Sequence, residues 1–254
     1  MILRNNNGTI SFSIFSQFPE LVCLMSTRNN GNLWISDKGL GIIEIFLNKQ
    51  GIRLNQFITM EQCHGNNVGI VKNRADGIKI KKVDGMVTGL SEIFIGVNTA
   101  DCVPVFFYNP QKGLIGVVHA GWKGTLENIS GKTMQILNNL GSDPKEIFAA
   151  IGPHIGGCCY IVNSARAANF KNTFPNHQVA FQDRGSWHID LGLANRLQLL
   201  ESGILESHID TPITCTSCQN NLYFSFRKDA KDSYGEMLGV IGMRKDLGRD
   251  EIWI

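Results

Sequence analysis

A cysteine and a histidine that could act together lie within residues 99–124 of this 254-residue chain. Cys102 comes directly before one apolar run, residues 103–108, and His119 comes directly after another, residues 114–118. An Asn-Pro pair and a glycine separate the runs, which predicts two strands joined by a tight connection. If these strands pair as a hairpin, the two side chains meet at its open end. A thiolate beside an imidazole is typical of a metal site or of a nucleophile with its base.

A second histidine lies in a comparable position. His64 follows a predicted strand, Phe57–Met60, and opens a glycine loop. Two imidazoles and one thiolate suit Zn²⁺ bound by three protein ligands, with a fourth position open to water or substrate. From residue types alone, this zinc site and a metal-free pair of Cys102 with His119 both remain open.

Two basic residues lie where an anion could bind. Arg28 follows a predicted strand at Leu21–Met25, and Lys123 lies in a glycine-flanked turn that begins a helix. A guanidinium and the amides at a helix start both suit anions. An arginine at the end of a strand is more often a solvated surface charge, and for Lys123 an ordinary helix start with an exposed lysine fits equally well.

The cysteines also include a spacing that is common in metal and redox sites. Cys215 and Cys218 form a Cys-x-x-Cys motif, but no second pair of that kind follows. Cys158 and Cys159 are adjacent, so we do not expect them to serve as the missing pair. The motif is therefore interpreted as packing.

The composition is that of an ordered globular protein. Apolar residues make up 43% of the chain and charged residues 18%, and the formal net charge is +2. No basic run with interleaved aromatics indicates a nucleic-acid partner, and no apolar run approaches the roughly 20 residues of a membrane span. The first residues show no secretion signal. We therefore expect a cytoplasmic protein with reduced cysteines, and the sequence leaves its oligomeric state open.

The pattern of elements predicts one domain over residues 1–254. Strands alternate with three or four helices, and many strands follow one another directly, which is typical of an α+β or mixed α/β fold with mixed sheets. One helix is expected over Leu126–Leu140, and the last strands are expected at Leu222–Arg227 and Met237–Met243.

Several motifs in order resemble one known family. They are Gln62–Val68 (QCHGNNV), Asp84–Thr88 (DGMVT), Thr99–Pro104 (TADCVP), His119–Gly124 (HAGWKG) and Gly152–Ile155 (GPHI), with Ser26–Arg28, Cys215–Thr216 and Phe224–Arg227 as further matches. Together they resemble the laccase-domain family, the peptidoglycan editing factor type of purine nucleoside phosphorylase. The match covers nearly the whole chain.

The resemblance implies a fold, an activity and a metal. The fold would be a four-layer α/β/β/α sandwich of two mixed sheets. The activities would be phosphorolysis of adenosine, inosine and methylthioadenosine, together with adenosine deamination. The zinc ligands would be His64, Cys102 and His119. Copper and polyphenol oxidation are also attributed to the family, but one such site lacks the several copper centres of a multicopper oxidase.

The implied chemistry gives roles to further residues. Phosphorolysis needs a bound phosphate, for which Arg28, Lys123 and Arg227 are the candidate contacts. Asp101, beside Cys102, could move a proton or orient a histidine.

The chain also departs from the family pattern. Ile161 follows Tyr160 where an acidic residue is usual, Glu236 follows Gly235 where arginine is common, and the segment between Gly31 and Phe57 is short. These changes leave substrate choice and phosphate affinity open. Two other functions remain: a metal-free Cys/His hydrolase or deamidase, and a non-catalytic protein that binds peptidoglycan precursors.

Overall fold

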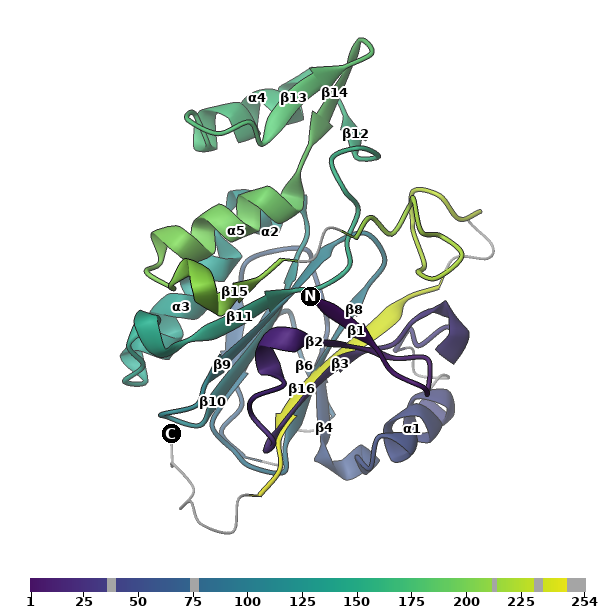
Figure 1. Ribbon diagram of the computed structural model, residues 1–254, viewed down its shortest axis with the longest axis vertical. Helices are drawn as coiled ribbons and strands as arrows, with labels where there is room; N and C mark the ends of the chain where they lie inside the picture. The colour runs from purple at the N-terminus through teal and green to yellow at the C-terminus, as the bar shows by residue number, and fades with distance from the viewer. Residues whose placement is uncertain (36–39, 74–77, 212–213, 231–234, 246–254) are drawn as a thin grey trace.

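The computed structural model describes residues 1–35, 40–73, 78–211, 214–230 and 235–245. Two mixed sheets pack against each other, and helices cover their outer faces (Figure 1). The predicted mixed α/β fold with two mixed sheets is confirmed.

The first main sheet has seven strands and is largely antiparallel. Their order is β1 (Ile2–Arg4), β2 (Ile10–Phe12), β3 (Leu21–Met25), β16 (Met237–Met243), β8 (Phe94–Thr99), β4 (Phe57–Met60) and β6 (Lys79–Ile80). β4 runs parallel to both of its neighbours, which makes the sheet mixed. The end of β4 leads the chain toward His64.

The second main sheet has six strands and contains the predicted hairpin. Their order is β15 (Ile209–Asp210), β11 (Phe148–Ile151), β9 (Val103–Asn109), β10 (Leu114–Ala120), β7 (Gly85–Thr88) and β5 (Val68–Ile70). β9 and β10 are antiparallel, with Val103 opposite Ala120 and Pro104 opposite His119. This register places Cys102 beside the end of β10, as the hairpin prediction required.

The alternation of side chains along β9 shows why both faces of its sheet are covered. Val105 and Phe107 pack under the helices, whereas Phe106 and Tyr108 pack between the two sheets. Successive side chains of a strand point to opposite faces, so a wholly apolar strand must be buried on both. All seven residues of β9 are buried.

Helices complete the four layers. α2 (Trp122–Leu126), α3 (Ile129–Asn139) and α5 (Leu191–Glu201) cover the six-stranded sheet. α1 (Leu40–Lys49) covers the seven-stranded sheet with buried side chains such as Ile43 and Leu47. Short 3₁₀ helices lie at Ser13–Phe15, Arg28–Asn30, Leu54–Gln56, Pro144–Glu146 and Glu206–His208.

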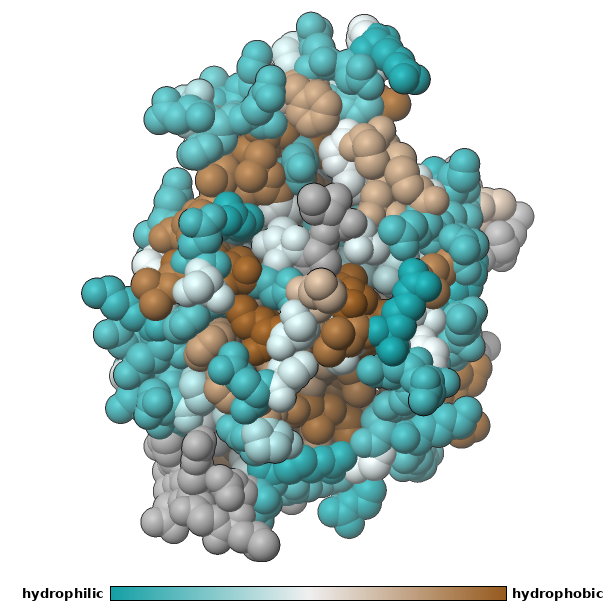
Figure 2. All heavy atoms as spheres, in the orientation of Figure 1, coloured by the Kyte–Doolittle hydropathy of each residue, from teal (hydrophilic) through white to brown (hydrophobic). Residues whose placement is uncertain are grey.

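A small third sheet forms a lobe that the sequence did not predict. It consists of β12 (Ile161–Val162), β14 (Ser186–Ile189) and β13 (Ala180–Asp183). α4 (Ser164–Thr173) packs on it, and the lobe lies at the top of Figure 1. Hydrophilic residues cover much of this lobe, whereas hydrophobic residues gather nearer the middle of the same face (Figure 2).

Two expected elements differ in the structure. The helix expected over residues 126–140 begins later, as α3 at Ile129, and Leu126 is instead the last residue of α2, because Asn128 adopts a left-handed conformation (φ 56°) and its side chain caps the start of α3. The strand expected at Leu222–Arg227 is absent from that described segment. Its backbone is held instead by turns, and the Ser225 N–H donates to the Asp229 carboxylate at 2.9 Å.

The longest helices that the structure describes, α3 and α5, have 11 residues each. Within the described parts of the chain, no helix has the length and apolar character that crossing a membrane would require.

Candidate active site and metal centre

Three side chains from separate parts of the chain meet at one end of the two sheets. His64 follows β4, Cys102 precedes β9 and His119 lies in β10. Their ligand atoms all lie within 4.8 Å of one another, and the two imidazole rings are perpendicular with centroids 4.7 Å apart. These residues, the histidine–cysteine group, could hold a metal ion.

A buried carboxylate supports this group. Asp84 Oδ1 lies 2.9 Å from His119 Nδ1 and accepts the backbone N–H of His64 at 2.9 Å. Its Oδ2 accepts the backbone N–H groups of Cys63 at 3.2 Å and Gly65 at 2.7 Å. One residue therefore orients a histidine ring and holds the loop that carries the other.

Asp84 also sets the tautomer of His119. Burial raises the pKa of Asp84, but hydrogen bonds from His119, Cys63 and Gly65 outweigh it and hold that pKa well below its usual range. An ionised carboxylate only accepts hydrogen bonds, so Nδ1 of His119 must donate. Nε2 is then the nitrogen available to a metal, which is the arrangement of histidine ligands supported by carboxylates.

Cys102 and His119 perturb each other's pKa strongly in the metal-free protein. Burial raises the pKa of Cys102, but the charges of His119 and His64 and their hydrogen bonds lower it from 9.0 to about 7. Burial lowers the pKa of His119, but the Cys102 thiolate and Asp84 together raise it from 6.5 to about 10. The group therefore favours a thiolate facing an imidazolium at neutral pH.

This perturbation predicts the pH dependence of Cys102 alkylation. The thiolate is the reactive form and exists above the thiol pKa, so a lowered pKa extends the reaction to lower pH. In chelator-treated protein, we expect alkylation of Cys102 by iodoacetamide to rise through a midpoint near pH 7, as followed by peptide mass spectrometry. His119→Gln should move the midpoint toward 9, and an unchanged midpoint would contradict the proposed coupling.

Two glycines of the HAGWKG segment make room for the group. A Cβ on Gly121 would lie 3.2 Å from Cys102 Sγ and 3.4 Å from His64 Cδ2. A Cβ on Gly124 would lie 2.5 Å from the backbone oxygen of Gly65, next to His64. Backbone cannot move aside as a flexible side chain can, so Gly124 fixes how closely α2 approaches the His64 loop.

We therefore predict that Gly124→Ala lowers both stability and activity. The loss of unfolding free energy should be about 1–3 kcal/mol, as for other overpacked sites, and thermal denaturation would measure it. Gly41→Ala is the matched control, because it also lies in a helix but its Cβ meets no atom within 4 Å. Equal melting temperatures for the two variants would refute the steric argument.

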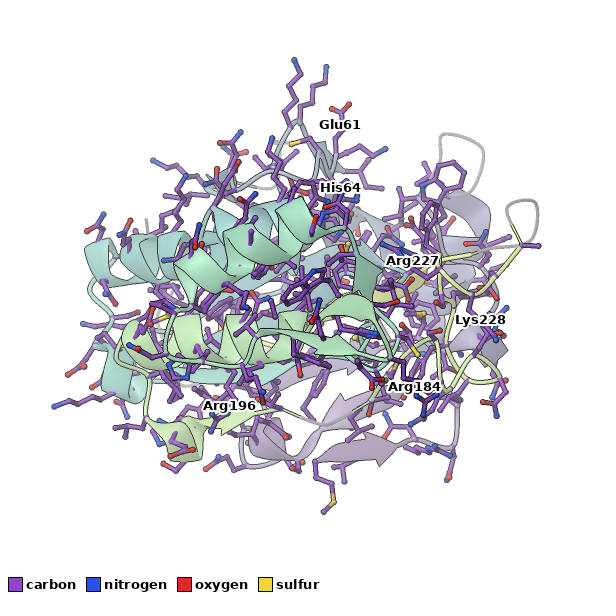
Figure 3. All side chains as sticks on the ribbon, turned by 90° about the horizontal axis from the view of Figure 1, so that it is seen from above. Glu61, His64, Arg184, Arg196, Arg227 and Lys228 are labelled. Atoms are coloured by element: carbon purple, nitrogen blue, oxygen red, sulfur yellow. The ribbon has the colours of Figure 1, made fainter. Side chains whose placement is uncertain are left out.

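The histidine–cysteine group opens into a cavity of about 370 Å³. The lining residues are Gln62, His64, Asn98, Thr99, Ala100, Asp101, Cys102, His119, Trp122, Ile155, Tyr160, Arg166, Leu191, Phe226, Arg227 and Glu236. Figure 3 shows His64 and Arg227 on the same side of the molecule. A cavity of this size, with apolar walls and a few convergent polar groups, suits a small molecule.

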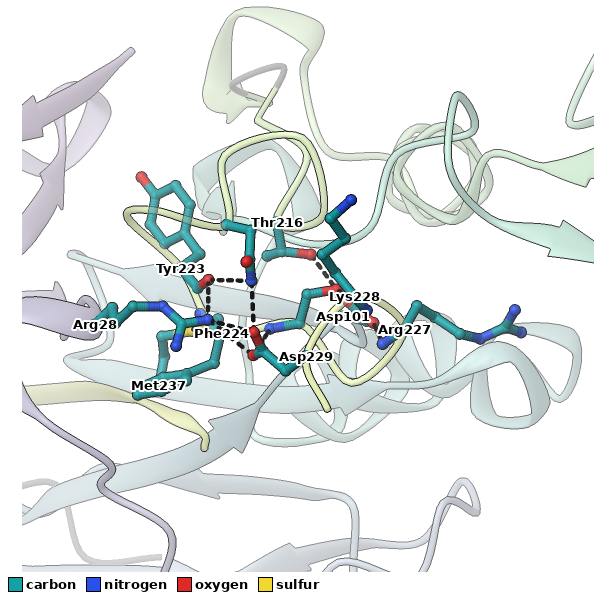
Figure 4. A network of polar contacts seen from close by, with 11 residues as sticks. Arg28, Asp101, Thr216, Tyr223, Phe224, Arg227, Lys228, Asp229 and Met237 are labelled. Atoms are coloured by element: carbon teal, nitrogen blue, oxygen red, sulfur yellow. Dashed lines mark hydrogen bonds and ion pairs between the residues drawn. The ribbon is translucent and has the colours of Figure 1, made fainter. Parts of the chain in front are cut away.

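Asp101 is held rigidly at the wall of the cavity. Its Oδ1 accepts a 2.6 Å hydrogen bond from the Thr216 hydroxyl, and its Oδ2 accepts the Arg227 backbone N–H at 2.8 Å (Figure 4). Its φ of 89° is costly for a residue with a Cβ. From the sequence, Asp101 was a candidate to orient a histidine of the histidine–cysteine group. In the structure, Asp84 makes that contact with His119.

The structure separates the three candidate anion contacts. Arg227 lines the cavity, with its guanidinium 4.9 Å from the centre of the Tyr160 ring. Arg28 instead pairs with Asp229 at 2.7 Å (Figure 4), and exposed Lys123 lies 3.9 Å from Glu127. Neither Arg28 nor Lys123 is among the described residues that line the cavity.

Arg166 is a cavity residue that sequence reasoning missed. It lies on α4 in the small lobe, and its guanidinium stacks 4.1 Å from the Trp122 ring. Glu236 also lines the cavity, and burial raises its pKa. The departure from the family pattern at Glu236 therefore falls within the site.

Four of the six cysteines other than Cys102 form a second group. Sγ of Cys158 and Cys159 both lie beside Sγ of Cys218, at 3.6 and 3.4 Å, and Cys215 completes the set. The expectation that adjacent Cys158 and Cys159 cannot serve as a second pair is therefore wrong. This four-cysteine cluster (Cys158, Cys159, Cys215, Cys218) could bind a metal.

Comparisons with known proteins show the family of the chain and support its fold. Residues 43–244 match the family described as multi-copper polyphenol oxidoreductase laccase. The chain belongs to this laccase-domain family. Relatives of this chain are named purine nucleoside phosphorylase or adenosine deaminase instead of laccase.

Relatives of this chain within the laccase-domain family align with most of its length. The purine nucleoside phosphorylase YlmD of Geobacillus stearothermophilus is 36% identical over 76% of this chain and 74% of its own. The adenosine deaminase RL5, from an unknown prokaryotic organism, is 31% identical over 82% of this chain and 84% of its own. The crystal structure of YlmD from G. stearothermophilus superimposes with a TM-score of 0.88 at 28% identity, covering 96% and 99% of the two chains.

Proposed function

We propose that this protein is a zinc-dependent purine nucleoside phosphorylase that also deaminates adenosine. The observation that carries the proposal is the opening of the histidine–cysteine group into a cavity that also contains two guanidinium groups and aromatic walls. The names of its relatives, purine nucleoside phosphorylase and adenosine deaminase, support the same substrate class.

The donor set fits zinc. His64, Cys102 and His119 would hold the ion, because two imidazoles and a thiolate within 4.8 Å of one another suit Zn²⁺ with an open fourth position. When bound, zinc would supply Lewis-acid chemistry and activate water near neutral pH. Asp84 would keep Nε2 of His119 directed at the ion.

The cavity residues account for phosphorolysis. Arg227 and Arg166 bind phosphate, since planar guanidinium groups match its oxygens in pairs. A phosphate oxygen bonds to C1′ of the ribose while the bond from C1′ to the base breaks, which gives ribose 1-phosphate and the free purine. The aromatic side chains Trp122, Tyr160 and Phe226 provide walls against which the purine packs.

Asp101 and Glu236 are the carboxyl groups of the cavity that can transfer protons. In phosphorolysis the departing base must gain a proton. In deamination, water adds to C6 of adenine and the amino group leaves as ammonia. The two reactions therefore use the same nucleoside but differ in the attacking group and in the atom attacked, which is C1′ of the ribose for phosphate and C6 of the base for water.

A direct assay tests this function. Metal-quantified protein is incubated with adenosine, inosine or methylthioadenosine, with and without phosphate, and the products are separated by chromatography. Adenine and ribose 1-phosphate that form only with phosphate would support the phosphorylase, and inosine formed from adenosine without phosphate would support the deaminase. Absence of turnover by zinc-loaded protein would refute the nucleoside assignment and favour a binding protein.

Arg227→Lys should weaken phosphate binding selectively. The substitution keeps the charge but loses paired hydrogen bonds, which are worth about 1.5–3 kcal/mol when charged. We therefore expect the KM for phosphate to rise by roughly tenfold to a hundredfold, with a smaller change in the KM for adenosine. Arg184→Lys is the control, because Arg184 lies in the exposed turn of the small lobe. An unchanged KM for phosphate would rule out Arg227 as a phosphate contact.

The lowered pKa of Cys102 also favours a second function, a metal-free hydrolase or deamidase with Cys102 as nucleophile and His119 as base. Activity that survives complete removal of metal by a chelator would support it. A multicopper oxidase needs several copper centres, whereas the described residues offer one histidine–cysteine group and one all-cysteine cluster. Copper is therefore the less favoured metal.

A further inference from the structure

The four-cysteine cluster lies where two turns of the chain meet. Cys158 and Cys159 lie in one turn, where the backbone N–H of Cys159 donates to Gly156. Cys215 and Cys218 lie in the other, where the N–H of Gln219 donates to Cys215. A single bridge between His154 and Cys215 aligns the two segments in parallel. The backbone thus brings four thiols together from positions about 60 residues apart.

The spacing of the sulfur atoms matches a tetrahedral metal site. Sγ of Cys158 lies 3.8 Å from that of Cys159 and 3.6 Å from that of Cys218, and Cys159 and Cys218 are 3.4 Å apart. Four sulfurs placed about 2.3 Å from a central Zn²⁺ would be about 3.8 Å apart. A disulfide would need about 2.05 Å, and all seven cysteines are free.

The surrounding backbone fits the same interpretation. A Cβ on Gly156 would lie 3.2 Å from Cys158 Sγ and 3.2 Å from Cys215 Cβ, so glycine permits the close approach of the two turns.

We propose that the four-cysteine cluster binds a structural Zn²⁺ that ties these two turns together. Four thiolates fill all four positions of a tetrahedral ion, so substrate has no open position, in contrast to the histidine–cysteine group. Binding converts thiols to thiolates and releases their protons to solvent, without any change in oxidation state. The proposal of a zinc ion here does not depend on whether the proposed nucleoside chemistry is correct.

The metal would hold two walls of the cavity in place. Cys215 precedes Thr216, whose hydroxyl binds Asp101 at 2.6 Å, and Cys159 precedes Tyr160, which packs against Arg227. The described segment 214–230 has no helix or strand beyond the bridge at Cys215. A bound metal of this kind adds most to the stability of a segment that has no regular secondary structure.

Metal content distinguishes the two groups. We expect the full-length wild-type protein to hold two zinc ions per chain by elemental analysis, and Cys215→Ser/Cys218→Ser to hold one. Cys23→Ala, which alters a buried thiol of β3 outside both groups, should still hold two. If the double serine variant keeps the full zinc content of the wild type, the proposal is overturned. Iron in place of the second zinc would also overturn it.

A second variant tests the cluster without altering it. His64→Ala/His119→Ala should keep one zinc, and that zinc should protect the four cluster thiols from maleimide until a chelator is added. Its Co²⁺-substituted form should show the absorption of a tetrahedral all-thiolate site. Absence of bound metal, or a disulfide that forms within the cluster although the protein is freshly prepared under reducing conditions, would contradict a zinc site even if the serine variant does not fold.

Discussion

His64→Ala should abolish adenosine phosphorolysis and remove zinc from the histidine–cysteine group. The side chain supplies one of three candidate ligands, and Cys102 and His119 alone leave the ion with too few protein contacts. Loss of Lewis-acid stabilisation worth several kcal/mol lowers kcat/KM by roughly 10³-fold or more. Steady-state kinetics together with elemental analysis would measure both effects.

This variant also separates zinc catalysis from the metal-free alternative. A hydrolase that uses Cys102 and His119 has no required role for His64, so its activity would survive the substitution. His177→Ala is the matched control, because His177 is an exposed histidine in a turn outside both candidate metal groups. If His64→Ala keeps its turnover while losing zinc, zinc is not the catalytic group.

Asp84→Asn should weaken both metal binding and turnover without changing the size of the side chain. The amide cannot accept at every position where the carboxylate now accepts from His119, His64 and Gly65. It also removes the charge that keeps Nδ1 of His119 protonated. Residues that support metal ligands in this way typically contribute 10- to 100-fold in metal affinity or activity, and we expect roughly that loss in both.

Zinc affinity from chelator competition and kcat/KM at saturating zinc would test this role. If Asp84 acts only by holding the ion, excess zinc should restore most of the activity. Asp183→Asn, at the exposed end of β13, should match the wild type in both measurements. An Asp84→Asn variant with wild-type zinc affinity would contradict the role assigned to the His119 contact.

The hairpin, and with it the meeting of Cys102 and His119, was predictable from the sequence alone. Two apolar runs with a breaker between them can pair in few ways, and the short connection between Asn109 and Leu114 fixes the register of β9 and β10. Cys102 and His119 therefore had to meet, and a local pattern was enough to predict it. The mixed α/β class also followed from strands that alternate with helices, whereas the arrangement as two mixed sheets was implied by the family resemblance.

The residues that support the site could be identified only in the folded chain. Asp84 reaches His119 because β7 pairs with β10, a partnership between strands that no local pattern specifies. Arg166 enters the cavity from a lobe that the sequence did not predict, and Arg28 is held by Asp229 about 200 positions away. A polar side chain carries no periodic signal, so its partner cannot be inferred from its neighbours in the chain.

The cysteines show the same limit most clearly. Spacing identified Cys215-x-x-Cys218 but excluded Cys158 and Cys159, because adjacent residues do not form the usual motif. The turn at Gly156 and the bridge from His154 to Cys215 nevertheless bring all four sulfurs within 4.8 Å. Ligand geometry is a property of atoms in space, and here two turns that are distant in sequence create it.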